Sequence, residues 1–264
     1  MITTDPLTRT LHDLNAQGIE LSFTVDTPPD GPYQEILRVQ DLLEGPRLRE
    51  VIERVARRMN TDDLAAAASL FQKRYCAQLL ISILTPLTRL RLGILAPAES
   101  VEIVLVDDLP ARLVLHKPET RTAPFENLEK EDSLRRAVFR SLFDDNLGRL
   151  SLQIATEIGL SLRVMWGNLG NYSCWLYEEV LTQEQTLQDR ALRDFEALMA
   201  CPGMTKTPPL SCACNKVFLE EAEPPQWVRV RQTCCLAYKF ADRPPCYTCP
   251  RLSSAERAKM IPKH

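Results

Sequence analysis

The chain has 264 residues, of which 45% are hydrophobic and 25% are charged, and its net charge is −3. This composition is typical of a globular protein and excludes a disordered or collagen-like chain. The longest apolar stretch, Leu79–Leu84, is far too short to span a bilayer, and the N-terminus lacks the basic start and apolar run of a secretory signal. We therefore expect a cytoplasmic protein; peripheral attachment to the inner membrane stays an open alternative.

The N-terminal forty residues predict three short elements. A helix is expected around Leu7–Leu14 and a strand over Ile19–Val25. The proline- and glycine-rich stretch Pro28–Pro32 then predicts a turn.

Two helices follow Gly45 and Pro46. The first is amphipathic, with apolar positions at helical spacing: Leu48, Val51, Ile52, Val55 and Met59. The second is expected to be capped by Asn60 or Thr61 and to carry a core-facing line that runs from Leu64 to Ile83. Pro86 is expected to end or kink this helix, because proline lacks the backbone N–H.

The middle of the chain predicts a ribbon and then more helices. The ribbon pairs Val101–Val106 with Arg112–Leu115. Helical periodicity then covers Ser133–Ile158, with an interruption near residues 144–148, and resumes at Tyr172–Leu181 and Gln183–Met199. The fold class predicted is α+β, with a mostly helical body, a small antiparallel sheet and a short metal-stapled C-terminal segment.

The character of the sequence changes after Ala200, where prolines punctuate a stretch without sustained periodicity. We expect a boundary around residues 215–225, which gives a body of residues 1–220 and a C-terminal segment of residues 221–264. A short strand is expected at Trp227–Arg231. The C-terminal segment is too small to bury a core of its own, so it would need a metal to hold its structure.

Nine cysteines in a reducing compartment indicate metal or redox chemistry more than disulfides. Cys76 and Cys174 lie on apolar helical faces and are expected to be small core residues. Cys246 and Cys249, two residues apart, have the spacing of a metal knuckle, but the adjacent Cys234 and Cys235 can ligate one site only if the backbone turns at that point. On spacing alone, a zinc staple and an iron-sulfur cluster are equal candidates.

The cysteine pattern also resembles a known family. A Cys-Cys pair, ten residues, Cys, two residues and Cys, near the end of the chain, is similar to the motif of the FhuF family of ferric-siderophore reductases. Arg231 and Thr233, just before the first pair, fit the same motif. The segment Met165–Tyr172 followed by Trp175 looks like the family's Trp-x-Asn-x-Gly segment opening a helix, and the helix end at Leu84–Leu87 is a weaker match.

This resemblance implies a [2Fe-2S] cluster held by four thiolates: Cys234, Cys235, Cys246 and Cys249. It also implies a cytoplasmic oxidoreductase that transfers one electron from this cluster to the Fe³⁺ of a ferric siderophore and releases Fe²⁺. An electron donor, a protein or another reductant, would be needed. Cys212 and Cys214 have no counterpart in the family, and any part they take stays open.

The C-terminal residues from Gln226 onward carry eight basic side chains and only two acidic ones. Such a charge suits an anionic cluster or substrate, whereas a nucleic-acid partner is not expected, because no stacking aromatic residues alternate with the basic ones. Six residues are candidates for contacting the siderophore or tuning the cluster: Trp166, Asn168, Asn171, Arg231, Lys239 and Arg243. For Trp166 a place in the core is an equally open interpretation.

Two other functions remain compatible with the sequence. One is a non-enzymatic siderophore-binding protein whose C-terminal segment is stapled by zinc. The other is an iron or redox sensor that uses the same cluster.

Overall fold

A computed structural model describes residues 23–124, 127–200, 214–241 and 243–261. A four-stranded sheet lies at one side of the molecule, in the order β1 (Phe23–Val25), β5 (Leu109–Leu115), β4 (Val101–Val106) and β2 (Glu35–Arg38). β1 runs parallel to β5, and the other pairs are antiparallel. The predicted ribbon is thus present, but as the centre of a wider sheet. The expected helix at residues 7–14 and most of the expected strand at 19–25 lie outside the described residues.

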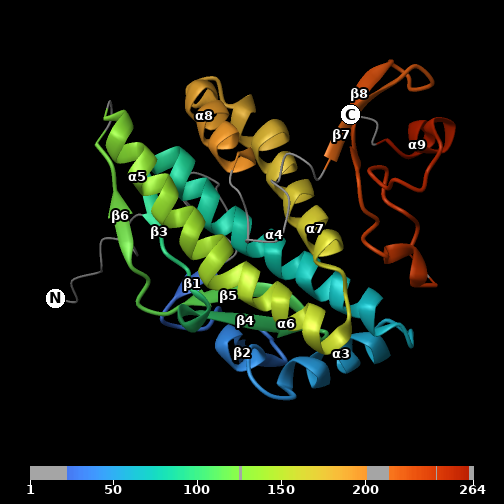
Figure 1. The fold of residues 1–264 in the computed structure, drawn as a ribbon, viewed down its shortest axis with the longest axis horizontal. Helices are drawn as coiled ribbons and strands as arrows, with labels where there is room; N and C mark the ends of the chain where they lie inside the picture. Colours follow the sequence, from blue (N-terminus) through green and yellow to red (C-terminus); the bar gives the residue numbers. More distant parts are fainter. Residues whose placement is uncertain (1–22, 125–126, 201–213, 242, 262–264) are drawn as a thin grey trace.

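Helix α4 (Leu64–Leu90) is the central element of the body. It packs on the sheet against β5 and is flanked by α3 (Arg47–Arg58) and α7 (Leu162–Trp175), as Figure 1 shows. Most of its side chains are buried on several sides, and this explains why its apolar pattern is broad. The fold class is α+β, as the sequence predicts.

The N-terminal end of α4 differs from the prediction, and at the C-terminal end one of the two predicted outcomes is excluded. The N-cap is Asp63, whose carboxylate accepts a hydrogen bond from the backbone N–H of Ala66 at 2.8 Å, and not Asn60 or Thr61. The helix also continues through Pro86 to Leu90 instead of ending there. Because Leu84 and Leu87 are buried in the core, tertiary packing holds this last turn in spite of the missing N–H.

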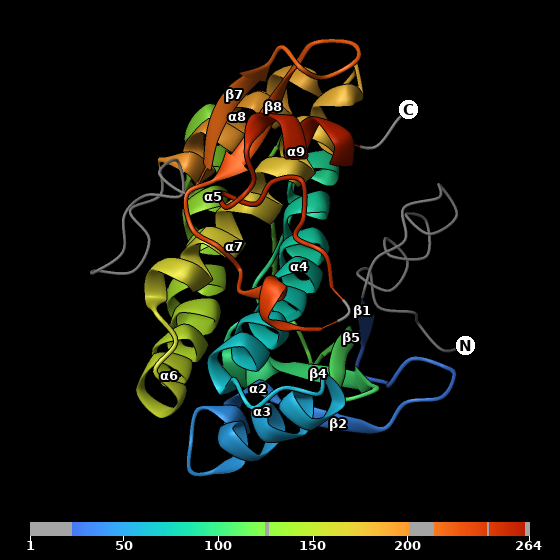
Figure 2. The ribbon, with the colours of Figure 1, turned by 90° about the vertical axis from the view of Figure 1, so that its right-hand side faces the viewer.

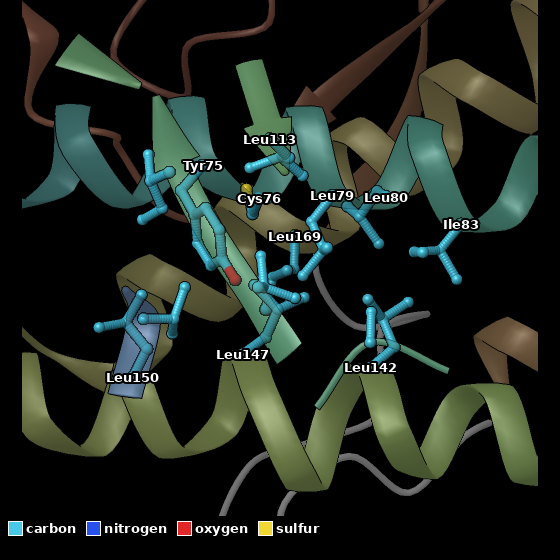
Figure 3. Packing of buried hydrophobic residues seen from close by; sticks show 14 of the residues in the cluster. Tyr75, Cys76, Leu79, Leu80, Ile83, Leu113, Leu142, Leu147, Leu150 and Leu169 are labelled. Atoms are coloured by element: carbon cyan, nitrogen blue, oxygen red, sulfur yellow. The ribbon is translucent and has the colours of Figure 1, made fainter. Parts of the chain in front are cut away.

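The core lies between α4 and the segment that follows the sheet. Figure 3 shows Tyr75 and Leu79 of α4 packing toward Leu142, Leu147 and Leu150. The Tyr75 hydroxyl donates to Oδ1 of Asn146 at 2.7 Å, so the one polar atom of this large side chain is paired. Cys76 and Cys174 are buried, which confirms their prediction as core residues.

A continuous helical segment forms the opposite wall of this core. It consists of α5 (Leu128–Phe139), a π-helical stretch η2 (Arg140–Leu147) and α6 (Gly148–Ile158). The interruption predicted near residues 144–148 is therefore not a break but a local widening of the helix, which shifts the register of its apolar positions. Gly159, with a φ of +79°, ends α6.

The next helix begins earlier than predicted. α7 starts after its N-cap Ser161, continues as the π-helical η3 (Leu176–Val180) and the 3₁₀ turn η4 (Leu181–Gln183), and is followed by α8 (Gln188–Met199). The Trp-Gly-Asn segment thus lies inside α7 and does not open it.

Short elements complete the body. α2 (Val39–Leu42) follows β2, and the 3₁₀ turn η1 (Ala98–Ser100) precedes β4. The pair β3 (Leu92–Ile94) and β6 (Thr120–Thr122) forms a second small antiparallel sheet beyond the end of α4, which the sequence did not predict.

The C-terminal part begins with an antiparallel hairpin, β7 (Cys214–Leu219) and β8 (Gln226–Arg231), of which the sequence predicted only the second strand. The position expected for the domain boundary falls within this hairpin. A small apolar group stabilises it: Leu219, Ala222 and Val228. After β8 the chain runs across α4 and α7, forms the 3₁₀ turn η6 (Ala237–Lys239) and ends in α9 (Ser254–Met260), as Figure 2 shows.

Candidate metal centre

The segment Arg231–Cys249, which we call the cysteine cassette, is attached to the body through α4 and α7. The hydroxyl of Ser69 on α4 donates to the backbone carbonyl of Cys235 at 2.9 Å, and this contact is buried. On α7, Gly167 lies so close to Thr233 that a Cβ at position 167 would be 2.0 Å from the Thr233 Oγ1. A glycine inside α7 therefore permits the close approach of the cassette.

The backbone of the cassette turns at both cysteine pairs. Leu236 adopts a left-handed conformation with a φ of +63°, and its N–H points at the Cys234 Sγ at 3.4 Å. At the second pair, the N–H of Cys249 donates to the carbonyl of Cys246 at 2.8 Å and closes a tight turn. This turn follows the first pair, so it does not lie between Cys234 and Cys235, where ligation of one site by both would require it.

These turns bring the four thiols together as two pairs. Cys235 interacts with Cys246, and Cys234 interacts with Cys249. In the described parts of the chain, however, no group of three or more His, Cys, Asp or Glu side chains is arranged to hold a single metal ion. By number and type, the four thiols could serve either as the ligands of a cluster with two iron atoms or as those of one tetrahedral zinc ion.

The electrostatics of the site favour a thiolate at Cys235 and a protonated thiol at its neighbours Cys234 and Cys246. Hydrogen bonding with the Cys246 thiol, aided by the charges of Lys73 and Arg231, lowers the pKa of Cys235 to about 4. The same interaction and burial raise the pKa of Cys246, and burial raises the pKa of Cys234. A shared proton between two such thiols leaves the site when a metal binds, because metal ligands must be deprotonated.

Arg231 is the most unusual residue near these thiols, because its side chain is only 1% exposed. Its Nη2 donates to Oδ1 of Asn168, whereas its Nε and Nη1 have no hydrogen-bond partner within the described residues. No carboxylate among those residues forms an ion pair with it either. A buried charge of this kind is costly unless an anion compensates it. A [2Fe-2S] cluster with four thiolates, whose oxidised form carries a charge of about −2, is such an anion.

Trp166 and Asn168 are both buried and contact protein groups. Trp166 packs edge-on against Phe143, with ring centroids 5.8 Å apart. Asn168 holds Arg231 through its oxygen and donates from its nitrogen to Oε1 of Gln72 at 2.9 Å. Asn168 therefore positions Arg231 in the structure, which is a role that the sequence did not indicate.

The other predicted residues are separated. Asn171 and Arg231 line a small cavity of about 330 Å³, which also includes Cys246 and Lys73. Arg243 lines a larger cavity of about 730 Å³ on another side of α4. Lys239 forms an ion pair with Asp63, the N-cap of α4, and so ties the cassette to the body.

Three residues near the site were not predicted. Ser69 and Lys73 of α4 face the cassette, but nothing in their sequence context distinguishes them from other helical residues. Arg257 of α9 donates from Nη2 to the carbonyls of Cys249 at 2.9 Å and Leu252 at 3.0 Å. α9 begins with a capping box, Ser253 and Glu256, which is readable in the sequence and could have located this helix.

The fold and the site thus define an α+β protein with a cysteine-rich C-terminal cassette packed on a helical body. The chain belongs to the FhuF family: the family model described as "Ferric iron reductase FhuF-like transporter" matches residues 69–235. The matched region includes α4 from Ser69 onward, all of α7 and the first cysteine pair, and it ends before Cys246. A comparison with curated protein sequences finds no significant match.

Solved structures with a similar fold are siderophore synthetases. Aerobactin synthetase IucA from a hypervirulent pathotype of Klebsiella pneumoniae has a TM-score of 0.57 and 14% identity, over 74% of this chain and 43% of that chain. The petrobactin biosynthesis protein AsbB from Bacillus anthracis str. Sterne has a TM-score of 0.49 and 12% identity, over 64% of this chain and 31% of that chain. The chain spans less than half the length of these proteins, and at such identity the likeness concerns the fold alone.

Proposed function

We propose that this protein is a [2Fe-2S] oxidoreductase that reduces the iron of ferric siderophores. The observation that carries the proposal is the gathering of four cysteines beside Arg231, whose buried guanidinium has no carboxylate partner among the described residues. Membership of a family named for ferric iron reduction supports the same reaction. The synthetases of similar fold are named for making siderophores, and this agrees with a siderophore as the substrate.

The chemistry requires one electron. Siderophores bind iron through hard oxygen donors, which hold Fe³⁺ far more tightly than the larger and less charged Fe²⁺. A reduced cluster held by the four cysteines would supply this electron to Fe³⁺; the chelate would then release Fe²⁺, and an external donor would supply the next electron. We place the reaction in the cytoplasm. No helix in the described residues is both long enough and apolar enough to cross a membrane.

The residues around the cassette have distinct roles in this proposal. Cys234, Cys235, Cys246 and Cys249 are the ligands. Arg231 and Lys73 place positive charge beside them and would stabilise the more negative, reduced form. Ser69 and Arg257 hold the backbone at the two ends of the cassette, so that the thiols stay in place when the charge changes.

The metal content of the purified protein distinguishes a zinc site from an iron-sulfur cluster. Prepared anaerobically, the protein is expected to be red-brown, with about two iron and two sulfide per chain. Replacing any of the four ligands by serine should abolish this content, whereas Cys174→Ser, in the core of the body, should retain it. A colourless protein with one zinc per chain would refute the proposal.

A turnover assay separates a reductase from a sensor. The reduced protein, mixed with a ferric siderophore and a ferrous chelator, should release Fe²⁺ while its cluster absorption returns to the oxidised form. With excess reductant the release should continue beyond one iron per cluster. A cluster that remains reduced in the presence of the siderophore would instead indicate a sensor.

A further inference from the structure

The larger cavity lies between the sheet and the cysteine cassette. Its walls come from the turn at residues 29–33, the end of α3, the strands β4 and β5, and α4. The cassette supplies two further residues, Phe240 and Arg243. A volume of about 730 Å³ is in the range of cavities that bind small molecules.

Arginines dominate the charge of this cavity. Four of them line it, and of these Arg58 lies 3.6 Å from the carboxylate of Asp107. The other three, Arg74, Arg112 and Arg243, have no ion pair with any described residue. Besides Asp107, Asp30 is the one acidic residue in the lining. The cavity therefore has an excess of positive charge.

Arg74 and Arg243 come from distant parts of the chain, and their positive charges repel each other. Burial, together with the positive charge of Arg243, lowers the pKa of Arg74. A guanidinium remains charged in spite of such a shift, so the repulsion between Arg74 and Arg243 persists until an anion enters. An anionic ligand would relieve this repulsion, so the charge of the cavity favours anions.

We propose that the larger cavity binds ferric chelates that carry free carboxylate groups, as citrate-based siderophores do, and that Arg74, Arg112 and Arg243 pair with those carboxylates. Arginine suits this role because its planar guanidinium can bind a carboxylate through two parallel hydrogen bonds. Arg243 and Phe240 belong to the same segment as Cys246, so the chelate would rest on the cassette itself. The inference names the substrate class and depends on the proposed function.

Binding can be tested without electron transfer by using gallium(III), which has nearly the size and the charge of Fe³⁺ but is not reduced under these conditions. Two probes are compared by calorimetry with the full-length, anaerobically prepared protein: gallium(III) citrate and the cationic gallium(III) complex of deferoxamine, a hydroxamate without carboxylates. The citrate complex should bind more tightly, and raising the salt concentration should weaken its binding.

Variants then locate the site. Arg112→Gln, at an exposed position of β5, and Arg243→Gln should each weaken binding of gallium(III) citrate by about tenfold or more, because a lost charge-assisted pair is typically worth 1.5–3 kcal/mol. Arg136→Gln, on the exposed surface of α5, is the matched control and should bind like the wild type. Equal binding by all these variants, or a loss confined to Lys73→Gln in the small cavity, would overturn the inference.

The two proposals fail in different ways. If the citrate complex binds as expected but the protein holds no cluster, the proposal of a reductase is wrong and the proposal of an anion-binding cavity is supported. If the protein reduces ferric chelates with an intact cluster but binds the two gallium probes equally, the reductase stands and the preference for carboxylates is wrong.

Discussion

Gly167 of α7 lies directly against Thr233, one residue before the first cysteine pair, and leaves no room for a side chain at position 167. The contact explains why a glycine occurs in the middle of a helix, where it normally costs stability. It also connects the two sequence features that suggested the family, the Trp-Gly-Asn segment and the cysteine motif. Both belong to one packing interface.

This interface can be tested with a double-mutant cycle. Replacing glycine by alanine inside a helix usually stabilises it by roughly 0.5–1 kcal/mol, but Gly167→Ala should instead destabilise the protein and reduce its iron content, because the new Cβ meets Thr233. Thr233→Ala removes the clashing oxygen and should recover most of the loss in the double variant. Urea unfolding and iron analysis measure both effects; purely additive changes would contradict the contact.

Replacing Arg231 should change the redox potential of the bound cluster. Removing the positive charge of Arg231 should lower the midpoint of a bound cluster by on the order of 100 mV in Arg231→Gln, whereas Arg231→Lys should retain most of the potential. Protein-film voltammetry measures the midpoint, with Arg136→Gln as the control.

The ion pair between Asp63 and Lys239 should make the free energy of unfolding depend on pH in acidic solution. Its pKa lies below the ordinary value of 3.8, chiefly because of the ion pair with Lys239 and in spite of some burial. A lowered pKa in the folded state means that the ion pair contributes its full stabilisation above the ordinary pKa and loses it as the pH falls through the folded value.

Asp63→Asn isolates this effect, since asparagine also caps helices well. The difference in unfolding free energy between wild type and this variant should be constant near neutral pH and should shrink below pH 3.8. Asp63→Ala should lose the cap as well, at a cost of about 1 kcal/mol. Urea titrations over a series of pH values measure these differences. If the difference between wild type and Asp63→Asn grows toward acid pH, the ion pair is not its source.

Trp166 should behave as a core residue. It is 3% exposed and packs against Phe143, so Trp166→Ala should lower the unfolding free energy by about 3–5 kcal/mol. Binding of gallium(III) citrate by the folded fraction should be unchanged. A loss of binding in a variant of normal stability would place Trp166 in the substrate site instead.

The sequence predicted the elements whose pattern is local. Alternation of apolar residues located β4 and β5, and helical periodicity located α3 and much of α4. It missed β2, β3 and β6, short strands whose partners lie far away in the chain, and it also missed β7, whose partner β8 follows in the same hairpin. It also left open whether α4 ends or only kinks at Pro86, because the burial that holds the turn after Pro86 is not visible in a single segment.

By itself, the sequence determined the α+β class, the family motif and the four candidate ligands, because cysteine spacing and hydrophobic periodicity are properties of neighbouring residues. Only the tertiary structure decided how those ligands pair, that Arg231 is buried beside them on Asn168, and that Gly167 makes room for Thr233. It also showed that Arg243 and Asn171 line two different cavities. These relationships join residues that are far apart along the chain, and only the packing of α4, α7 and the cassette brings them together.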